Sequence, residues 1–159
     1  MAGAGELISV MAGLVDALRG LDLVAGRMYS VGLDFVLAGP VSMWLQGFRG
    51  SQPEPLYLVL VSDTPENREL AVRAARPLSV EAPWPEEYSA VRQGRVVSVE
   101  IRGGLHLAVA ADPVVDVGGG QRRLLAREVA RIAGVAVVGW RPVRLAPISV
   151  ELALRGETG

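Results

Sequence analysis

Apolar residues recur along the chain at two spacings, and each spacing predicts a different kind of element. Over residues 5–19 they return every three or four positions, which predicts an amphipathic helix that Gly20 would end. Leu56–Val61 is an unbroken apolar run, with a length and composition typical of a buried central strand. The Thr-Pro-Glu sequence at 64–66 is typical of a helix start, and we expect that helix to reach about Ala75.

Shorter segments complete the predicted order of elements. We expect further strands at residues 33–38, 95–101, 105–110 and 135–139, and further helices at residues 22–31, 40–46 and 121–133. Residues 81–94 should be irregular or form a short helix, and residues 111–120 should be a loop. The tail at 147–155 alternates like a strand, but Pro147 also permits a short helix, which we favour.

Hairpins and strand-helix-strand units occur together in this order. The Arg-Gly-Gly sequence at 102–104 joins two predicted strands as a hairpin. Such a mixture predicts an α/β (α+β) fold with a single mixed β-sheet and flanking helices. The length of 159 residues predicts one domain over 1–159.

Composition excludes several classes of site. The chain has no cysteine, no lysine and a single histidine, His106, which excludes disulfides, thiolate metal sites, two-histidine sites and lysine Schiff bases. No apolar run is long enough to span a bilayer. The first basic residue is Arg19, so the N-terminus lacks the pattern of a signal peptide, and we expect a cytoplasmic protein with no membrane partner.

Charge is unevenly distributed along the chain. Residues 1–118 hold 14 acidic residues and 9 arginines, whereas residues 119–159 hold 3 acidic residues and 7 arginines. On the predicted helix at 121–133, Arg123, Arg127 and Arg131 are four residues apart and would form one stripe. These three are candidate contacts for an anion or a nucleic acid, but a solvated face with ion pairs to Glu128 is the simpler interpretation.

The order of motifs in the first half of the chain resembles a known fold. The matching segments are Phe35-Val36-Leu37, Gly39, the turn at 46–49, the strand at 56–61 and Pro65-Glu66-Asn67. Together they resemble the DNA polymerase beta-like nucleotidyltransferase fold family, and in particular its small prokaryotic members. These often occur beside helical partner proteins, so the resemblance also implies a protein partner.

The resemblance also implies positions for the family's chemistry. Two carboxylates, one residue apart on a strand, hold two magnesium ions in active members. Counting back from Pro65 places them at Leu56 and Leu58, and neither side chain can bind a metal ion. The second position of the phosphate-binding Gly-Ser turn is Pro40, which has no amide hydrogen. The sequence therefore indicates a degenerate member with no catalytic residues and no metal site.

Other residues near these motifs keep alternatives open. A nucleotide could still contact Gly39, Ser42 or Arg49, although a helix-cap or surface role is the simpler one for Ser42. Glu54 and Glu100 are candidate residual acids, for which an exposed structural role is simpler. A glycine run at 118–120 could present amides to an anion, but a surface loop is the simpler interpretation.

We therefore expect a nucleotide-binding or protein-interaction module that is not an enzyme and needs no cofactor. A protein partner or a homo-oligomer is expected, a bound nucleotide is allowed, and nucleic acid is not favoured. The first alternative is an active metal-dependent nucleotidyltransferase with displaced acids, which would need magnesium. The second is a nucleic-acid-binding protein that uses the arginine stripe, although few aromatic residues accompany those arginines.

Overall fold

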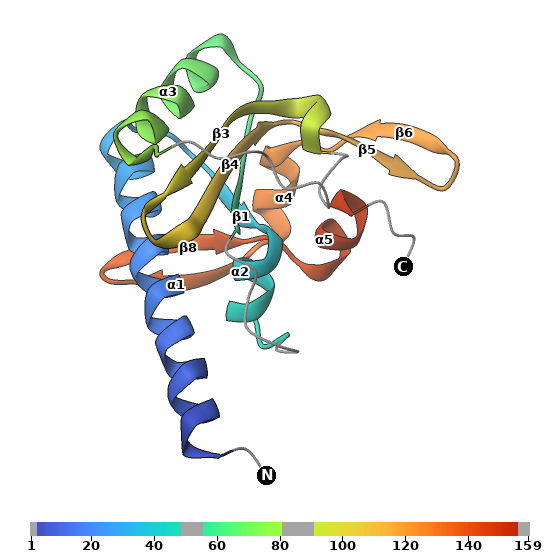
Figure 1. Ribbon diagram of the computed structural model, residues 1–159. Helices are drawn as coiled ribbons and strands as arrows, with labels where there is room; N and C mark the ends of the chain where they lie inside the picture. Colours follow the sequence, from blue (N-terminus) through green and yellow to red (C-terminus); the bar gives the residue numbers. More distant parts are fainter. Residues whose placement is uncertain (1–2, 49–55, 81–90, 156–159) are drawn as a thin grey trace.

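The computed structural model describes residues 3–48, 56–80 and 91–155 (Figure 1). In chain order its elements are α1 (Ala4–Ser30), β1 (Val36–Ala38), α2 (Gly39–Leu45), β2 (Leu56–Val61), α3 (Pro65–Ala75), the 3-10 turn η1 (Arg76–Leu78), β3 (Arg95–Ile101), the 3-10 turn η3 (Arg102–Gly104), β4 (Leu105–Ala111), β5 (Val114–Val117), β6 (Gly120–Arg123), α4 (Ala126–Ile132), β7 (Gly134–Val138), β8 (Arg141–Leu145) and α5 (Ile148–Leu154). No helix in the described ranges is both long and apolar enough to cross a membrane.

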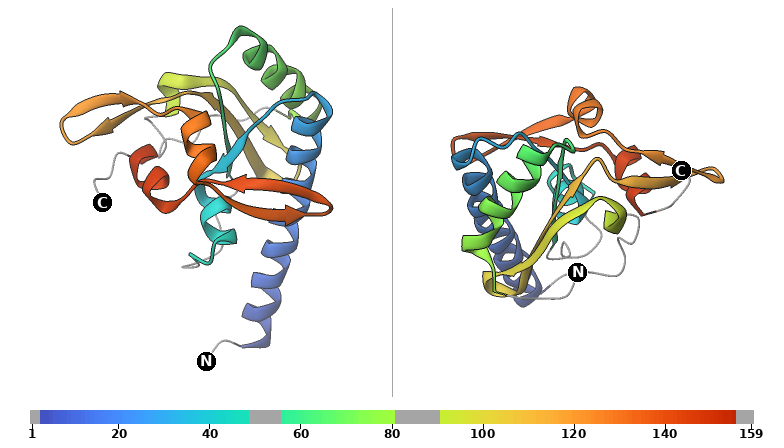
Figure 2. Two further views of the ribbon diagram at one scale, coloured as in Figure 1. Left: turned by 180° about the vertical axis from the view of Figure 1, so that it is seen from behind. Right: turned by 90° about the horizontal axis from the view of Figure 1, so that it is seen from above.

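Six strands form one mixed sheet in the order β3-β4-β2-β1-β8-β7. At its centre β2 runs antiparallel to β1 and parallel to β4, while β1 runs parallel to β8. Helices α1 and α3 cover one face, and α4 and α5 lie against the other (Figure 2). The β5–β6 hairpin forms a separate two-stranded sheet. This arrangement confirms the predicted α/β class with a mixed sheet and flanking helices.

The central strand β2 is buried on both faces, which explains its unbroken apolar sequence. Tyr57 and Val59 belong to the core beneath α1 and α3, whereas Leu56, Leu58 and Leu60 belong to the core beneath α4 and α5. The two sets alternate because successive side chains on a strand point to opposite faces. A strand covered on both sides has no position for a polar residue.

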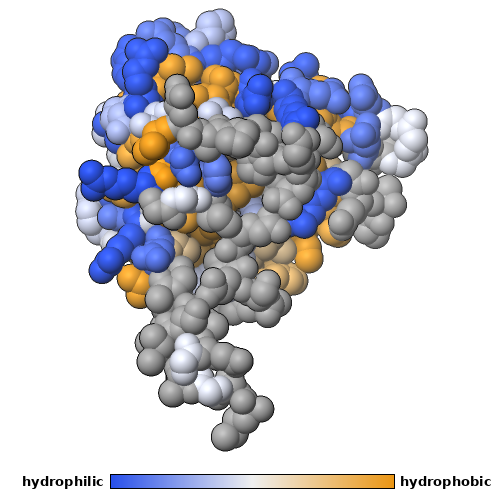
Figure 3. Space-filling model, in the orientation of Figure 1, coloured by the Kyte–Doolittle hydropathy of each residue, from blue (hydrophilic) through white to orange (hydrophobic). Residues whose placement is uncertain are grey.

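Helix α3 begins and ends where the sequence predicted. The Thr64 hydroxyl accepts a hydrogen bond from the backbone N–H of Asn67 at 3.0 Å, and Pro65 occupies the first turn. Its inner face is buried alanine, and its outer face carries the pair Arg73–Glu69 at 3.0 Å. Figure 3 shows the hydrophilic side chains that gather over this helix. The β3–β4 hairpin, β7 and the helical tail α5 are likewise confirmed.

Helix α1 does not end at Gly20, as the sequence predicted, but continues to Ser30 and includes the expected turn at 22–31. Gly20 is buried, and a Cβ atom built there would lie 2.2 Å from the Tyr57 hydroxyl oxygen. The glycine is therefore needed for close packing on β2 and not for a helix end.

The segment from 111 to 145 differs most from the prediction. β5 and β6 form a hairpin where a loop and the start of a helix were expected, and α4 begins only at Ala126. Gly118 and Gly119 both have positive φ at the hairpin turn, +54° and +88°, so the glycine run makes a β-turn. β8 was not predicted, and β1 is shorter than expected. Residues 81–90 of the expected irregular segment lie outside the described residues.

Candidate functional site

The chain turns sharply where β1 passes into α2. Ala38 is extended, Gly39 has φ of +80°, and Pro40 lies in the first turn of α2. A Cβ atom at Gly39 would lie 3.0 Å from the Cβ atom of Leu58. Both the positive φ and the close approach require glycine at this position. The turn thus sits directly against β2.

Leu56 and Leu58 occupy the two predicted metal positions on β2. They are 2% and 0% exposed, and both point into the core beneath α4 and α5. Leu58 lies opposite Ala38 in the antiparallel β1–β2 pairing. Magnesium takes oxygen ligands, and these two side chains offer none, so the position does not fit the ion.

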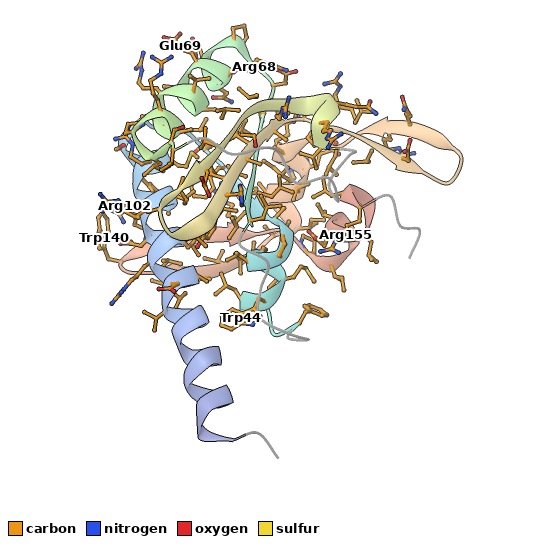
Figure 4. All side chains as sticks on the ribbon, in the orientation of Figure 1. Trp44, Arg68, Glu69, Arg102, Trp140 and Arg155 are labelled. Carbon is orange, nitrogen blue, oxygen red and sulfur yellow. The ribbon has the colours of Figure 1, made fainter. Side chains whose placement is uncertain are left out.

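A carboxylate from α5 binds the turn. The backbone N–H of Gly39 donates a hydrogen bond to Glu151 Oε2 at 2.9 Å, and Glu151 is only 5% exposed. The other oxygen, Oε1, accepts a hydrogen bond from Arg155 Nε at 2.9 Å. Arg155 comes from the end of the same helix (Figure 4). The amide at the start of α2 is therefore bound to an internal anion that is itself paired with a guanidinium group.

Sequence reasoning missed Glu151. The tail was predicted to be a short helix. The sequence signal that could have identified Glu151 is that it is the one acidic residue inside a largely apolar stretch at 148–154. An acid on the buried side of a helix needs a partner. Which partner it has depends on the tertiary fold, since Gly39 is 112 positions away.

Ser42 lies in the middle of α2 and is fully buried. Its hydroxyl oxygen accepts a hydrogen bond from Gln46 Nε2 at 3.1 Å, and the same amide group donates to the carbonyl of Ala146 at 2.8 Å. The predicted cap or surface role of Ser42 is therefore wrong, and the residue helps to tie α2 to the segment before α5. Arg49 and Glu54, the other predicted residues of this region, lie outside the described residues.

Glu100 shares a sheet face with Leu56 but lies two strands away. Glu100 on β3 is opposite His106 on β4, which is opposite Leu56 on β2. At about 4.8 Å per strand, Glu100 is roughly 10 Å from Leu56 across the sheet. His106 Nδ1 is buried and has no hydrogen-bond partner among the residues that the structure describes. Within the described ranges, no three His, Asp or Glu residues group so that they could hold a metal ion.

The predicted arginine stripe is divided between two elements. Arg123 lies on β6, where it donates to the carbonyl of Asp112 at 3.2 Å and lies 3.7 Å from Asp63. The hydrogen bond from Arg68 to Asp63 lowers the pKa of that carboxyl group, and the charge of Arg123 adds to the effect. Arg127 and Arg131 lie on α4, so the prediction that the three arginines form one stripe on a single helix is wrong.

Two solved structures share this architecture. One is TM1012 from Thermotoga maritima, described as a candidate nucleotidyltransferase, with a TM-score of 0.60 and 13% identity over 86% of this chain and 80% of that one. The other is the lincosamide antibiotic adenylyltransferase LnuA bound to lincomycin, with a TM-score of 0.56 and 6% identity over 84% and 82%. The chain has the nucleotidyltransferase fold. No protein-family model matches the sequence, and no curated protein sequence matches it at a significant level.

The turn at Gly39 and the strand β2 are two of the segments that resemble the nucleotidyltransferase fold in the sequence. The resemblance seen in the sequence rested on the order of strand, glycine turn, helix and strand, and that order is confirmed. In the resemblance drawn from the sequence, Leu56 and Leu58 stand at the positions of the metal-binding carboxylates, and Gly39 stands in the phosphate-binding turn. The structure brings Gly39 and Leu58 into contact and adds Glu151 to them.

Proposed function

We propose that this protein is a catalytically inactive member of the nucleotidyltransferase fold that works by binding a protein. The observation that carries this proposal is the hydrogen bond between the Gly39 amide and the buried carboxylate of Glu151, beside Leu58. A triphosphate would need that amide, and two metal ions would need oxygen ligands where Leu56 and Leu58 stand. Neither the free amide nor the oxygen ligands are present at this turn.

The first experiment measures thermal unfolding with each nucleoside triphosphate, with and without magnesium. A ligand present at a hundred times its Kd would stabilise the folded state by about 2.7 kcal/mol and raise Tm by roughly 5–10 °C. We expect no magnesium-dependent shift. A shift that requires magnesium and disappears in Glu100→Gln would instead support an enzyme with displaced acids, and it would refute the inactive state.

The binding surface that we propose is the free edge of the sheet at β7. Its sequence, Gly-Val-Ala-Val-Val, carries no charge and no proline, and Val135 and Val137 are 62% and 72% exposed. The opposite edge strand, β3, carries Arg95 and Glu100 and an irregular register, features that discourage pairing between sheet edges. An unprotected apolar edge strand pairs readily with another strand.

The partner that we propose for β7 is a second copy of the same chain. An uncharged strand offers no electrostatic selection for a different partner, and an antiparallel pair of identical strands closes with two-fold symmetry. At the tip of the hairpin, Trp140 is 79% exposed, with the Arg141 guanidinium group 4.5 Å from its ring centre (Figure 4). This aromatic residue extends the apolar surface beside the edge strand.

Light scattering after size-exclusion chromatography tests the self-association. We expect the wild-type chain to be a dimer and Val137→Lys to be a folded monomer, because Val137 is mostly exposed. Val80→Lys is the matched control, since Val80 is 55% exposed far along the chain from β7. A monomeric wild-type chain, or a dimer that Val137→Lys leaves intact, would refute the interface.

A further inference from the structure

A cavity lies at the other end of β1 and β2 from Gly39. Its volume is about 300 Å³, and its lining comes from the segment before β1, the end of β2, helix α4 and strand β8. Helix α4 crosses β1 here (Figure 2). The cavity lining reaches Val36 and Leu60 but includes neither Gly39, Leu58 nor Glu151. The cavity is therefore distinct from the turn at Gly39.

Three arginines converge on this cavity from two elements. Arg127 and Arg131 lie one turn apart on α4, and Arg144 comes from β8. All three are exposed, and none has a hydrogen-bond or ion-pair partner among the residues that the structure describes. Against these three positive charges the lining holds one acid, Asp34, which leaves a net charge of +2.

Arginines elsewhere in the molecule form ion pairs where a carboxylate is near. Arg68 is bound to Asp63 at 2.6 Å, Arg141 to Asp22 at 3.0 Å, and Arg155 to Glu151 at 2.9 Å. Glu128 lies next to Arg127 in the sequence yet forms no salt bridge with it. Three like charges that share a single acid repel each other, and an anion bound between them removes that cost.

The floor of the cavity is apolar. It is formed by Phe35, Val36 and Leu60, and Ala130 contributes from α4. A neighbouring cavity of about 450 Å³ shares Asp34, Phe35 and Arg144 with it and adds Tyr29, whose ring stands edge-on to Phe35 at 6.1 Å. An apolar floor with a few convergent polar groups is the usual composition of a small-molecule site.

We propose that this cavity binds a small organic phosphate that carries an aromatic ring. Guanidinium groups bind phosphate oxygens in pairs, and three of them match a group with three terminal oxygens. The ring would lie over Phe35, and Asp34 can accept a hydrogen bond from a hydroxyl or amino group. The proposal does not depend on the inactive state of the Gly39 turn, because the two places share no residue.

Isothermal titration calorimetry of the full chain with phenyl phosphate tests the site. Inorganic phosphate and phenol are the two halves of the probe and are titrated separately. We expect phenyl phosphate to bind at least tenfold more tightly than either half, and Arg127→Gln, Arg131→Gln and Arg144→Gln each to weaken it about tenfold or more. Arg102→Gln, an exposed arginine on η3, is the matched control and should change binding less than twofold.

Two results would overturn the proposal. The first is phenyl phosphate binding that the three arginine substitutions leave unchanged, or no binding at all, in variants whose thermal unfolding matches the wild type. The second is tighter binding of a single-stranded oligonucleotide than of phenyl phosphate. The oligonucleotide's affinity would fall steeply as the salt concentration rises, and the same three arginine substitutions would weaken it. That result would assign the surface to nucleic acid.

Discussion

Replacing Gly20 with alanine tests why a glycine stands in the middle of α1. In an exposed helix this substitution stabilises by about 1 kcal/mol, because alanine loses less backbone entropy than glycine. At Gly20 the new Cβ atom would lie 2.2 Å from the Tyr57 hydroxyl oxygen, 2.7 Å from Leu105 Cδ1 and 2.8 Å from Tyr57 Cζ. Helix α1 or Tyr57 must therefore move.

The size of the effect follows from what must move. Tyr57 is fully buried, and its hydroxyl donates a hydrogen bond to the carbonyl of Ala17 at 2.6 Å. Overpacking a core by one methyl group costs about 1–3 kcal/mol, and loss of the buried hydrogen bond adds about 1 kcal/mol. After subtraction of the gain in helix propensity, we expect Gly20→Ala to lower the free energy of unfolding by about 1–3 kcal/mol.

Urea unfolding followed by circular dichroism measures this difference. Gly26→Ala is the control, since it lies in the same helix and the atoms nearest to its Cβ atom would be those of the flexible Arg141 guanidinium group, at 3.5 Å or more. We expect Gly26→Ala to be neutral or to stabilise by up to about 1 kcal/mol. If Gly20→Ala is as stable as Gly26→Ala, then helix propensity governs both positions and the packing argument is wrong.

Two further predictions concern side chains that form hydrogen bonds with the backbone of distant segments. Burial raises the pKa of the Tyr57 phenol well above its ordinary value, and the Asp16 carboxylate raises it further, so the unfolded chain loses this proton first as pH rises. Above about pH 10 we expect wild-type stability to fall by up to about 1.4 kcal/mol per pH unit more steeply than that of Tyr57→Phe, in urea unfolding at several pH values. Asp112 has φ of +39° and accepts from the amides of Asp63 at 2.9 Å and Ala126 at 2.8 Å. We expect Asp112→Ala to lower Tm by roughly 4–10 °C in calorimetry. Asp112→Asn keeps one acceptor and tolerates positive φ, so it should lower Tm by less than half as much. Equal losses of Tm in the two variants would contradict the hydrogen-bond account.

The elements that the sequence predicted correctly are those whose signals are local. Leu56–Val61 could be identified because a strand buried on both faces must be apolar throughout. Helix α3 could be identified because its start needs a hydroxyl, a proline and an acid within a few positions. The sharp turn at Gly39 also left a local signal, since the following Pro40 both ends a strand and suits the first turn of a helix.

The features that sequence reasoning missed depend on residues far apart in the chain. Gly20 resembles a helix end by itself, and only the position of Tyr57 shows that it marks a close contact. The cluster of Arg127, Arg131 and Arg144 depends on where α4 lies on β1 and β2, which brings it to the same cavity as β8, so spacing along one helix selected Arg123 in error. The β5–β6 hairpin has a polar second strand with no alternation, and the glycine run was therefore interpreted as a loop.

The residues around Gly39 form one interacting set. A backbone N–H at the start of a helix has no partner within the helix, and when buried it needs an acceptor from elsewhere. In an active nucleotidyltransferase, the phosphate of the substrate can serve as that acceptor. In this protein the turn is buried and α5 lies against α2, so the Gly39 amide needs an internal acceptor. Glu151 supplies it, and Arg155 balances its charge. If the protein is inactive, as we propose, the leucines on β2 and the acid on α5 belong together, because without Glu151 the buried Gly39 amide would lose its acceptor.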